Sequence, residues 1–549
     1  MSTPPTGFGP AASGAGAPAR AGPLFWALGA LLVAYVALCT GQRDNLLEAD
    51  AWEHHRAIVA LVADFWQPGN PTFGGDAAAI PSIRYSPYFV GMVAFARATD
   101  LDPWHILSAA AVFNTLLLVV GVRALLGALG RPEVSGVALL VMVGLYGGAP
   151  GYANSYALAD LPWHQVNPSA FAFGLVLLAW SLFLGLASGR APKAGWFILP
   201  LLFATAMLDH PMTGALGFLG LGIFSVFGAA SGAERIRRLT IAVAVGVPAA
   251  AACFAWPWFS FLRALTLRPD NQYWFNPGIL KMMLTQWCAP AVLLSLWCLA
   301  ARDQRTIRVL LAGGAACLAL GLAAMAARSA ALARLPLPGL IFFHLAVAVA
   351  AHDAGLLSPR RWIERARALR AGGPAAAAAA HAAVGAAVLA YFLAPQLWAV
   401  LREPHLARSP IARALGRPDK QLNLLPQYRE ALAPVGPRDV VFSDGPTSWP
   451  VPSVRGRIVA AIHYEFFVPG QPERERDAAR FFEAGPDGAT EEERLALLDK
   501  YGATWLLLDT ARLTGPQRTA LLREHAVAAR SGDLTLMDAA AWRAAPGPP

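Results

Sequence analysis

The chain has 549 residues, of which 56% are hydrophobic and only 14% are charged. This composition excludes a water-soluble enzyme, in which about a quarter of the residues are charged. The net charge of +9 does not indicate nucleic-acid binding, because the basic residues lie in short loops between apolar runs, where they report orientation in a membrane. The apolar runs recur from residue 23 to residue 401, each near the roughly 20 residues that cross a bilayer.

The N-terminal segment 1–22 is rich in Gly, Ala and Pro and is predicted to be a disordered tail. Pro23–Cys39 is long for a signal-peptide core, and Leu38 is not the small residue that a cleavage or lipid-attachment site needs. We therefore expect an uncleaved first transmembrane helix. The five cysteines lie in or beside apolar segments without CxxC spacing, which argues against a disulfide framework or a zinc site.

An acidic stretch, Gly41–Asp64, follows this first helix. On a helix Asp50, Glu53 and His54 share one face, and Trp52 and Leu61 are expected to lie against the bilayer interface. Ionisable groups beside a membrane are costly and usually functional. Two plainer alternatives are a solvated polar linker for the whole stretch and a solvated position on the helix surface for Glu53.

The basic loops predict the topology. If the short apolar segment Tyr88–Ala98 does not cross, every cluster of several basic residues falls on one side, including the arginines of 360–370. The prediction is a polytopic α-helical membrane protein with about eleven transmembrane helices over residues 23–401. Its outer loops are 41–103, 151–167 and 260–281.

From residue 402 the composition becomes that of a soluble domain, and 402–549 is predicted to be a small α/β domain on the outer face. The expected elements are strands at Asp439–Phe442, Arg457–Ala461, Thr504–Leu508 and Leu534–Met537, and helices at Asp477–Glu483 and Glu491–Lys500, the second with Thr490 as N-cap. It lacks nucleotide-binding and serine-nucleophile motifs. A packing or lid role is the favoured interpretation.

Polar residues gather at the predicted outer ends of the helices. Carboxylates and imidazoles from several loops suit a divalent cation such as Mg²⁺ or Mn²⁺, and outer arginines suit a phosphate leaving group. The candidate cation ligands are Asp50, Glu48, His54, Asp160 and His164; the candidate donor-phosphate ligands are Arg263, Arg268 and Arg334; further candidates are His210 and Arg84. The plain alternatives are a helix cap for His210 and lipid-headgroup contacts for the arginines.

This layout resembles the GT-C superfamily of membrane glycosyltransferases, which includes protein O-mannosyltransferases and lipid A aminoarabinose transferases. The stretch Glu48-Ala49-Asp50-Ala51-Trp52 is similar to the family's first-loop motif, in which an Asp precedes an aromatic residue. Ala51 stands where a second acid is usual, which puts the metal ligands in doubt. Arg334 followed by Leu335-Pro336-Leu337-Pro338 is similar to the start of a helix in bacterial members.

The resemblance implies a glycosyltransferase of the bacterial cytoplasmic membrane that moves a sugar from a polyprenyl-phosphate-type donor to an acceptor at the outer, periplasmic face. Asp50 is then the general base. The acceptor is a glycan, lipid or protein. Two alternatives stay open, a transporter or flippase and a catalytically silent assembly subunit. The nearly acid-free spans favour the enzyme over the transporter, whereas Ala51 keeps the silent subunit open.

Overall fold

The computed structural model describes residues 22–41, 50–146, 156–266, 281, 283–299, 305–327, 330–356, 358–371, 373–402, 424–461, 465, 467–485 and 488–544. The chain forms two compact units, each built from three segments. Unit 1 comprises Met1–Gln42, Ser108–Ala255 and Gln272–Lys420; unit 2 comprises Arg43–Leu107, Trp256–Asn271 and Gln421–Pro549. The sequence alone predicts one division near residue 402, whereas the structure groups the first-loop residues with the C-terminal region.

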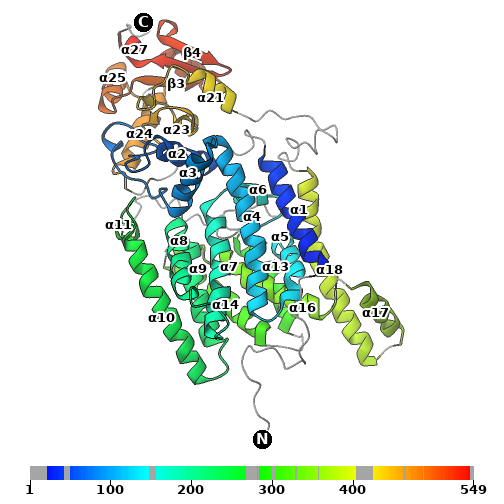
Figure 1. Cartoon of the computed structure of the whole chain (residues 1–549). Helices are drawn as coiled ribbons and strands as arrows, with labels where there is room; N and C mark the ends of the chain where they lie inside the picture. Colours follow the sequence, from blue (N-terminus) through cyan, green and yellow to red (C-terminus); the bar gives the residue numbers. More distant parts are fainter. Residues whose placement is uncertain are drawn as a thin grey trace. The chain divides into compact units, whose positions relative to one another are not determined.

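Unit 1 is a bundle of helices (Figure 1). They are α1 (Pro23–Thr40), α4 (Pro103–Ala128, whose first residues belong to unit 2), α5 (Ser135–Gly144), α6 (Leu161–His164), α7 (Pro168–Ala187), α8 (Gly195–Asp209), α9 (Pro211–Val226), α10 (Gly232–Phe254), α13 (Ala289–Leu299), α14 (Arg305–Ala326), α15 (Ala330–Ala333), α16 (Pro336–Asp353), α17 (Pro359–Ala371) and α18 (Gly373–Arg402). A π-helical turn, Met283–Cys288, precedes α13.

Within the described ranges, 7 helices are long and apolar enough to cross a membrane: α1, α4, α7, α10, α14, α16 and α18. Three shorter apolar helices, Pro132–Gly144, Gly195–Asp209 and Pro211–Val226, coincide with further crossings predicted from the sequence. The polytopic helical character is thus confirmed, and the total of about eleven crossings stays a prediction. The segment expected not to cross forms α3 (Pro87–Thr99), whose 13 residues are fewer than the roughly 20 that a crossing needs.

Helix α16 lies at the centre of unit 1, with every residue from Pro336 to Ala351 buried. A helix that is apolar all round lies in the core of a protein or crosses a membrane, and α5, α13 and α14 pack against this one. Glycine permits the closest of these contacts. A Cβ atom added at Gly313 of α14 would lie 2.7 Å from the Phe342 ring of α16. Small residues of this kind let membrane helices approach one another closely.

Unit 2 contains a mixed five-stranded sheet in the order β2-β1-β3-β5-β4. The strands are β1 (Val440–Phe442), β2 (Arg457–Ile458), β3 (Trp505–Asp509), β4 (Val527–Ser531) and β5 (Leu534–Asp538). Strand β1 runs parallel to β2 and β3, while β5 is antiparallel to β3 and β4. Four of the five strands and both longer helices, α24 (Gln471–Phe482) and α25 (Glu491–Lys500), agree with the predicted elements; β4 was missed.

The first-loop segment is part of the core of unit 2. Phe73 forms a parallel bridge with Ile458 beside strand β2. Its fully buried ring packs with Tyr428, Val441 and Leu507. The loop therefore contributes to the hydrophobic core on which the sheet rests. The remaining helices of the unit are α2 (Asp50–Ala63), α11 (Phe261–Thr266), α21 (Leu425–Ala431), α22 (Gly445–Ser448), α23 (Val451–Val454), α26 (Gly515–Leu521) and α27 (Ala539–Ala544).

Candidate functional site

Helix α2 carries the acidic stretch that the sequence singled out. Asp50 and Glu53 occupy its first turn, where carboxylates interact favourably with the positive end of the helix dipole. The solvated-linker alternative is wrong for this helix, because residues 51–58 are all buried. The expectation that Trp52 lies against the bilayer interface is also wrong. Trp52 packs within unit 2 against Leu425, and the Ser453 hydroxyl donates a hydrogen bond to its backbone carbonyl.

Three buried side chains, Glu53, Arg56 and Glu465, and the partly buried Arg84 form what we call the buried charge cluster. Arg84 pairs with Glu53 through Nη2 and with Glu465 through Nε, the latter at 3.2 Å. Arg56 Nη2 lies 2.9 Å from Glu465 Oε1 and 3.7 Å from Glu53 Oε1. Glu53 is only 1% exposed, so its interpretation as a solvated surface residue is wrong.

Further donors complete the hydrogen bonding of the two carboxylates. Ser82 Oγ donates to Glu465 at 2.8 Å and Thr72 Oγ1 at 3.2 Å. Trp449 Nε1 donates to Glu53 at 3.3 Å. Two formal negative charges thus meet two formal positive charges. Burial of charge is tolerated when the groups are paired and hydrogen-bonded in this way.

The pKa values of the two arginines in the buried charge cluster are shifted in opposite directions. Burial lowers the pKa of Arg56, and the nearby carboxylates only partly oppose this effect. Burial also acts to lower the pKa of Arg84, yet the charges of Glu53, Glu465 and Asp50 outweigh it and raise that pKa. Arg84 is the most exposed member, with 18% of its side chain accessible. It is therefore a firmly charged group that interacts with the buried carboxylates and with Asp50.

Asp50 itself lies at the first position of α2 and is half-buried. Its negative charge acts on Arg84, which places the two side chains in one electrostatic environment. Further along the helix, Glu53 pairs with Arg84 and Arg56 pairs with Glu465, which fixes α2 to the rest of unit 2. Asp50 is thus a partly accessible carboxylate at the end of a helix that buried ion pairs hold in place.

The two imidazoles of α2 are buried. His54 packs against the Phe89 ring, with centroids 5.3 Å apart. Burial lowers the pKa of His55 to about 3, although the charge of Asp102 and a hydrogen bond with the Ser453 backbone oppose it. His55 is thus neutral at physiological pH.

The other predicted site residues divide between the two units. Arg84 and Arg263 belong to unit 2 with Asp50, and the Arg263 guanidinium lies over the Phe467 ring, 5.3 Å from its centroid. Unit 1 contains Asp160, His164, His210 and Arg334. Glu48 and Arg268 lie outside the described residues.

Within unit 1, the structure brings His210 and Arg334 into electrostatic contact. His210 is the N-cap of α9, where its ring accepts a hydrogen bond from the Thr213 backbone. The helix-cap alternative for His210 is therefore confirmed. Arg334 is 5% exposed and lies two residues before the start of α16.

The predicted cation site does not fit the described part of the chain. No group of three or more His, Cys, Asp and Glu side chains among these residues is arranged to hold a metal ion. Divalent cations such as Mg²⁺ need several oxygen ligands converging on one point. We therefore derive no chemical step through a cation.

Sequence reasoning missed two members of the buried charge cluster, Arg56 and the acidic Glu465. Glu465 is the only acidic residue between Asp444 and Glu473, and apolar and aromatic residues surround it. A lone acid in such a run is a signal of a buried partner. Its partner Arg56 lies 409 positions away, so the sequence does not reveal the pairing.

Comparison with known proteins gives a likeness of fold. No protein-family model and no curated protein matches the sequence. Among solved structures, arabinofuranosyltransferase AftD from Mycobacteria superimposes with a TM-score of 0.52 at 18% identity, over 89% of this chain and 35% of that chain. ArnT from Cupriavidus metallidurans bound to undecaprenyl phosphate gives a TM-score of 0.49 at 15% identity, over 96% of this chain and 100% of that chain.

The oligosaccharyltransferase AglB from Archaeoglobus fulgidus, in complex with an inhibitory peptide and a dolichol-phosphate, gives a TM-score of 0.46 at 13% identity, over 89% of this chain and 70% of that chain. The likeness of fold to arabinofuranosyltransferase AftD covers most of this chain. The protein is a polytopic helical membrane protein with a GT-C-like fold and a small C-terminal mixed sheet.

Proposed function

We propose that the protein transfers a sugar from a polyprenyl-phosphate-type donor to an acceptor hydroxyl at the outer face of the membrane, with Asp50 as the general base. The observation that supports this proposal most is the position of Asp50, a half-buried carboxylate at the end of a helix that ion pairs with Glu465 and Arg84 anchor. The likeness of fold to arabinofuranosyltransferase AftD supports the reaction class.

In the proposed step, the Asp50 carboxylate accepts the proton of the acceptor hydroxyl. The acceptor oxygen bonds to the anomeric carbon of the donor sugar as the bond from that carbon to the phosphate oxygen breaks. The electron pair of the broken bond leaves with the lipid phosphate. A general base must lie within hydrogen-bond reach of the proton that it removes, so a fixed α2 is a requirement of this mechanism.

Arginines are the groups that we propose for the leaving phosphate. Arg334, buried beside His210 in unit 1, is the first candidate, because a guanidinium donates two parallel hydrogen bonds to a phosphate. Arg263, exposed in unit 2, is the second. Substitution of the group that binds the donor phosphate by Gln should weaken donor binding roughly tenfold or more.

The test is transfer of a labelled sugar from polyprenyl-phosphate donors by purified variants. Asp50→Asn keeps the shape and removes the basicity, so turnover should fall about 10²- to 10⁴-fold while donor binding persists. Asp64→Asn is the matched control. Asp64 follows the other end of α2 and accepts hydrogen bonds from the backbone of Trp66 and Gln67, which an Asn oxygen also accepts.

Full activity of Asp50→Asn would remove the assignment of the base, and Asp160 would be the next carboxylate to substitute. Donor binding by the wild-type protein without transfer to any acceptor would instead favour the catalytically silent subunit.

A further inference from the structure

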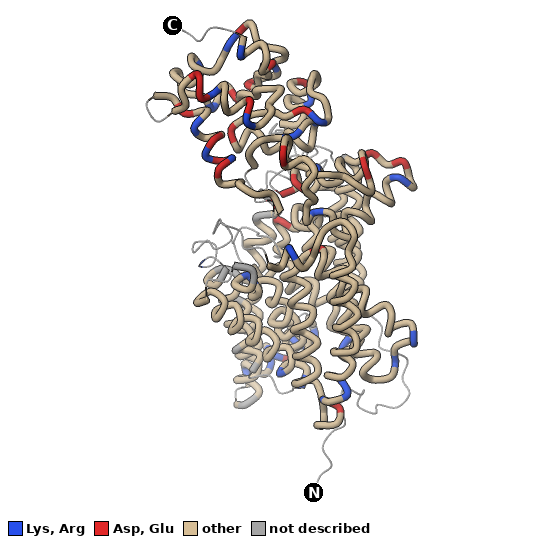
Figure 2. Tube along the Cα trace, turned by 90° about the vertical axis from the view of Figure 1, so that its left-hand side faces the viewer, with Lys and Arg blue, Asp and Glu red and all other residues tan. Residues whose placement is uncertain are grey.

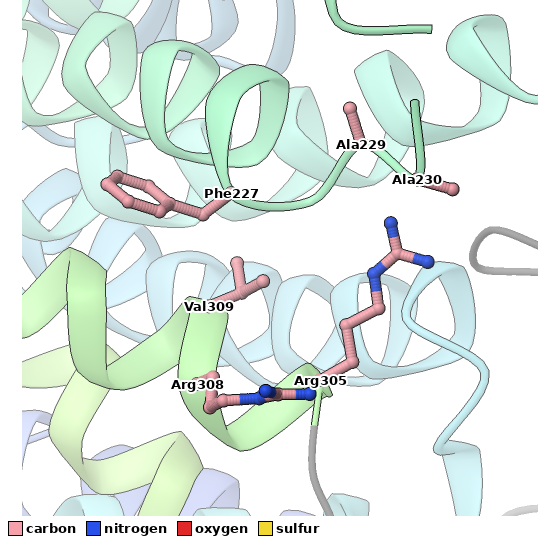
Figure 3. Close-up of a pocket in the computed structure, with 6 residues that line it drawn as sticks. All are labelled: Phe227, Ala229, Ala230, Arg305, Arg308 and Val309. Carbon is pink, nitrogen blue, oxygen red and sulfur yellow. The ribbon is translucent and has the colours of Figure 1, made fainter. Parts of the chain in front are cut away.

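A pocket of about 390 Å³ lies in unit 1, between the loop after α9 and the first turn of α14. The lining residues are Phe227, Ala229, Ala230, Arg305, Arg308 and Val309. Figure 3 shows Arg305 extending from α14 toward the Ala229–Ala230 backbone, with Arg308 on the same helix. The volume falls within the roughly 300–1,000 Å³ of ordinary ligand pockets.

The pocket is electropositive. Its six lining residues include two arginines and no acid. The Arg305 guanidinium is held at the pocket wall, because Nη2 donates a hydrogen bond of 2.9 Å to the Gly228 carbonyl. This hydrogen bond fixes the orientation of the guanidinium, so a ligand that binds to it costs little further side-chain freedom.

Among the residues that the structure describes, Glu234 is an acid close enough for its charge to interact with Arg305. Glu234 of α10 lies at 2.5 Å from Arg238 and accepts a 2.6 Å hydrogen bond from the Ala230 backbone. Its charge is thus offset by Arg238, while Arg235 and Arg237 on the same turn add positive charge. Lys and Arg gather at this end of unit 1, at the bottom of Figure 2.

The pocket borders an apolar surface. Phe227 is 53% exposed at its rim, and α10 begins two residues after Ala230. One side of α10 exposes Ile236, Val243 and Val247, each to 65% or more. Helix α10 is also long and apolar enough to cross a membrane. A ligand with an anionic head and apolar chains matches this combination better than a small soluble anion does.

We propose that this pocket binds the phosphate of an anionic phospholipid headgroup through Arg305 and Arg308, with the acyl chains along the exposed face of α10. Phosphate is the anion that arginine recognises best, and basic pockets between membrane helices are suited to lipid headgroups. This site is distinct from Asp50 and does not depend on the proposed transfer reaction.

The experiment titrates fluorescent phosphatidylglycerol into the purified full-length protein in zwitterionic micelles. Arg305→Gln with Arg308→Gln should weaken binding roughly tenfold or more, the loss expected for charge-assisted contacts. Ala229→Leu fills the pocket and keeps both arginines, so it should weaken binding as well. Arg367→Gln with Arg370→Gln, two exposed arginines of α17, is the control for general charge and should leave binding nearly unchanged.

Equal weakening by the control pair, or unchanged binding by Ala229→Leu, would overturn the pocket as the site. Inorganic phosphate that displaces the lipid at similar concentration would show a soluble-anion site and overturn the lipid assignment. A photoactivatable phosphatidylglycerol gives a test on the wild-type protein. We expect cross-links in the peptides that contain Phe227–Ala230 or Arg305–Val309, and cross-links confined to other peptides would contradict the proposal.

Discussion

At the scale of single residues, the buried charge cluster explains why α2 is held so firmly in unit 2. Removing four charges from water is costly, and only mutual pairing and hydrogen bonding offset that cost. Glu465 receives hydrogen bonds from Arg56, Arg84, Thr72 and Ser82. The cluster therefore acts as a positioning device for the helix that begins with Asp50.

Substitution of one carboxylate tests how much the stability of unit 2 depends on the buried charge cluster. Glu465→Gln leaves buried positive charge without its counter-charge, and such losses cost about 3–5 kcal/mol. We expect the apparent Tm to fall by about 10 °C, measured by intrinsic fluorescence. Glu473→Gln is the control, because its ion pair with Lys500 joins side chains that are 56% and 43% exposed. An exposed pair contributes less than about 1 kcal/mol, so equal shifts in both variants would contradict the importance of burial.

His55 should make the stability of unit 2 depend on pH. Its folded pKa of about 3 lies below the usual 6.5, because burial disfavours the charged imidazole. The unfolded chain therefore binds the proton first, and this stabilisation, complete above pH 6.5, is lost as the pH falls from about 6.5 toward 3. Between pH 7 and pH 5 the loss is about 2 kcal/mol.

The measurement compares apparent Tm at pH 7 and pH 5. In His55→Gln the difference between the two values should shrink, whereas His525→Gln, at an exposed position, should keep the wild-type difference. An unchanged difference in His55→Gln would show that other groups carry the acid sensitivity.

At the scale of elements, the features that depend on local sequence patterns were predicted, and those that depend on contacts between distant residues were not. Apolar length located the spans, and the N-cap pattern at Thr490 is confirmed as a capping box with Glu493. Strand β4 was not predicted because only one of its residues, Ser531, is buried. Its sequence therefore lacks the run of apolar residues that marks a buried strand. The buried charge cluster and the two-unit division were not predicted because they depend on residues hundreds of positions apart.

Close helix packing gives a prediction within one helix. A Cβ atom added at Gly220 of α9 would lie 2.2 Å from the fully buried Trp180 ring of α7, whereas one at Gly222 would meet nothing within 4 Å. Trp180 has little room to move, since it stacks on Phe342 and donates a hydrogen bond to the Gly217 carbonyl. Overpacking costs about 1–3 kcal/mol.

Gly220→Ala should therefore lower the apparent Tm. Gly222→Ala should leave it unchanged or raise it slightly, because Ala favours a helix over Gly by up to about 1 kcal/mol. Equal effects of the two substitutions would mean that α7 and α9 are not packed as the structure describes.

At the scale of the whole molecule, the basic residues of unit 1 predict the topology. The arginines of α17, from Arg360 to Arg370, form the most basic segment, and the positive-inside rule assigns such segments to the cytoplasm. One apolar helix, α18, follows, and its stretch Ala375–Trp398 is long enough to cross. We therefore propose that the C-terminal region from residue 402 lies outside the cytoplasm, together with Asp50 of the same unit.

Two fusions to a reporter that is active only in the cytoplasm test this topology. A fusion that ends after Arg370 precedes α18 and should be active, and a fusion after Pro549 follows α18 and should be silent. A reporter active only outside the cytoplasm should give the reverse pair. Because the two fusions differ by α18, equal activity would show that this helix does not cross. Activity of the cytoplasmic reporter only after Pro549 would invert the orientation and place Asp50 on the side where the proposed lipid-linked transfer does not occur.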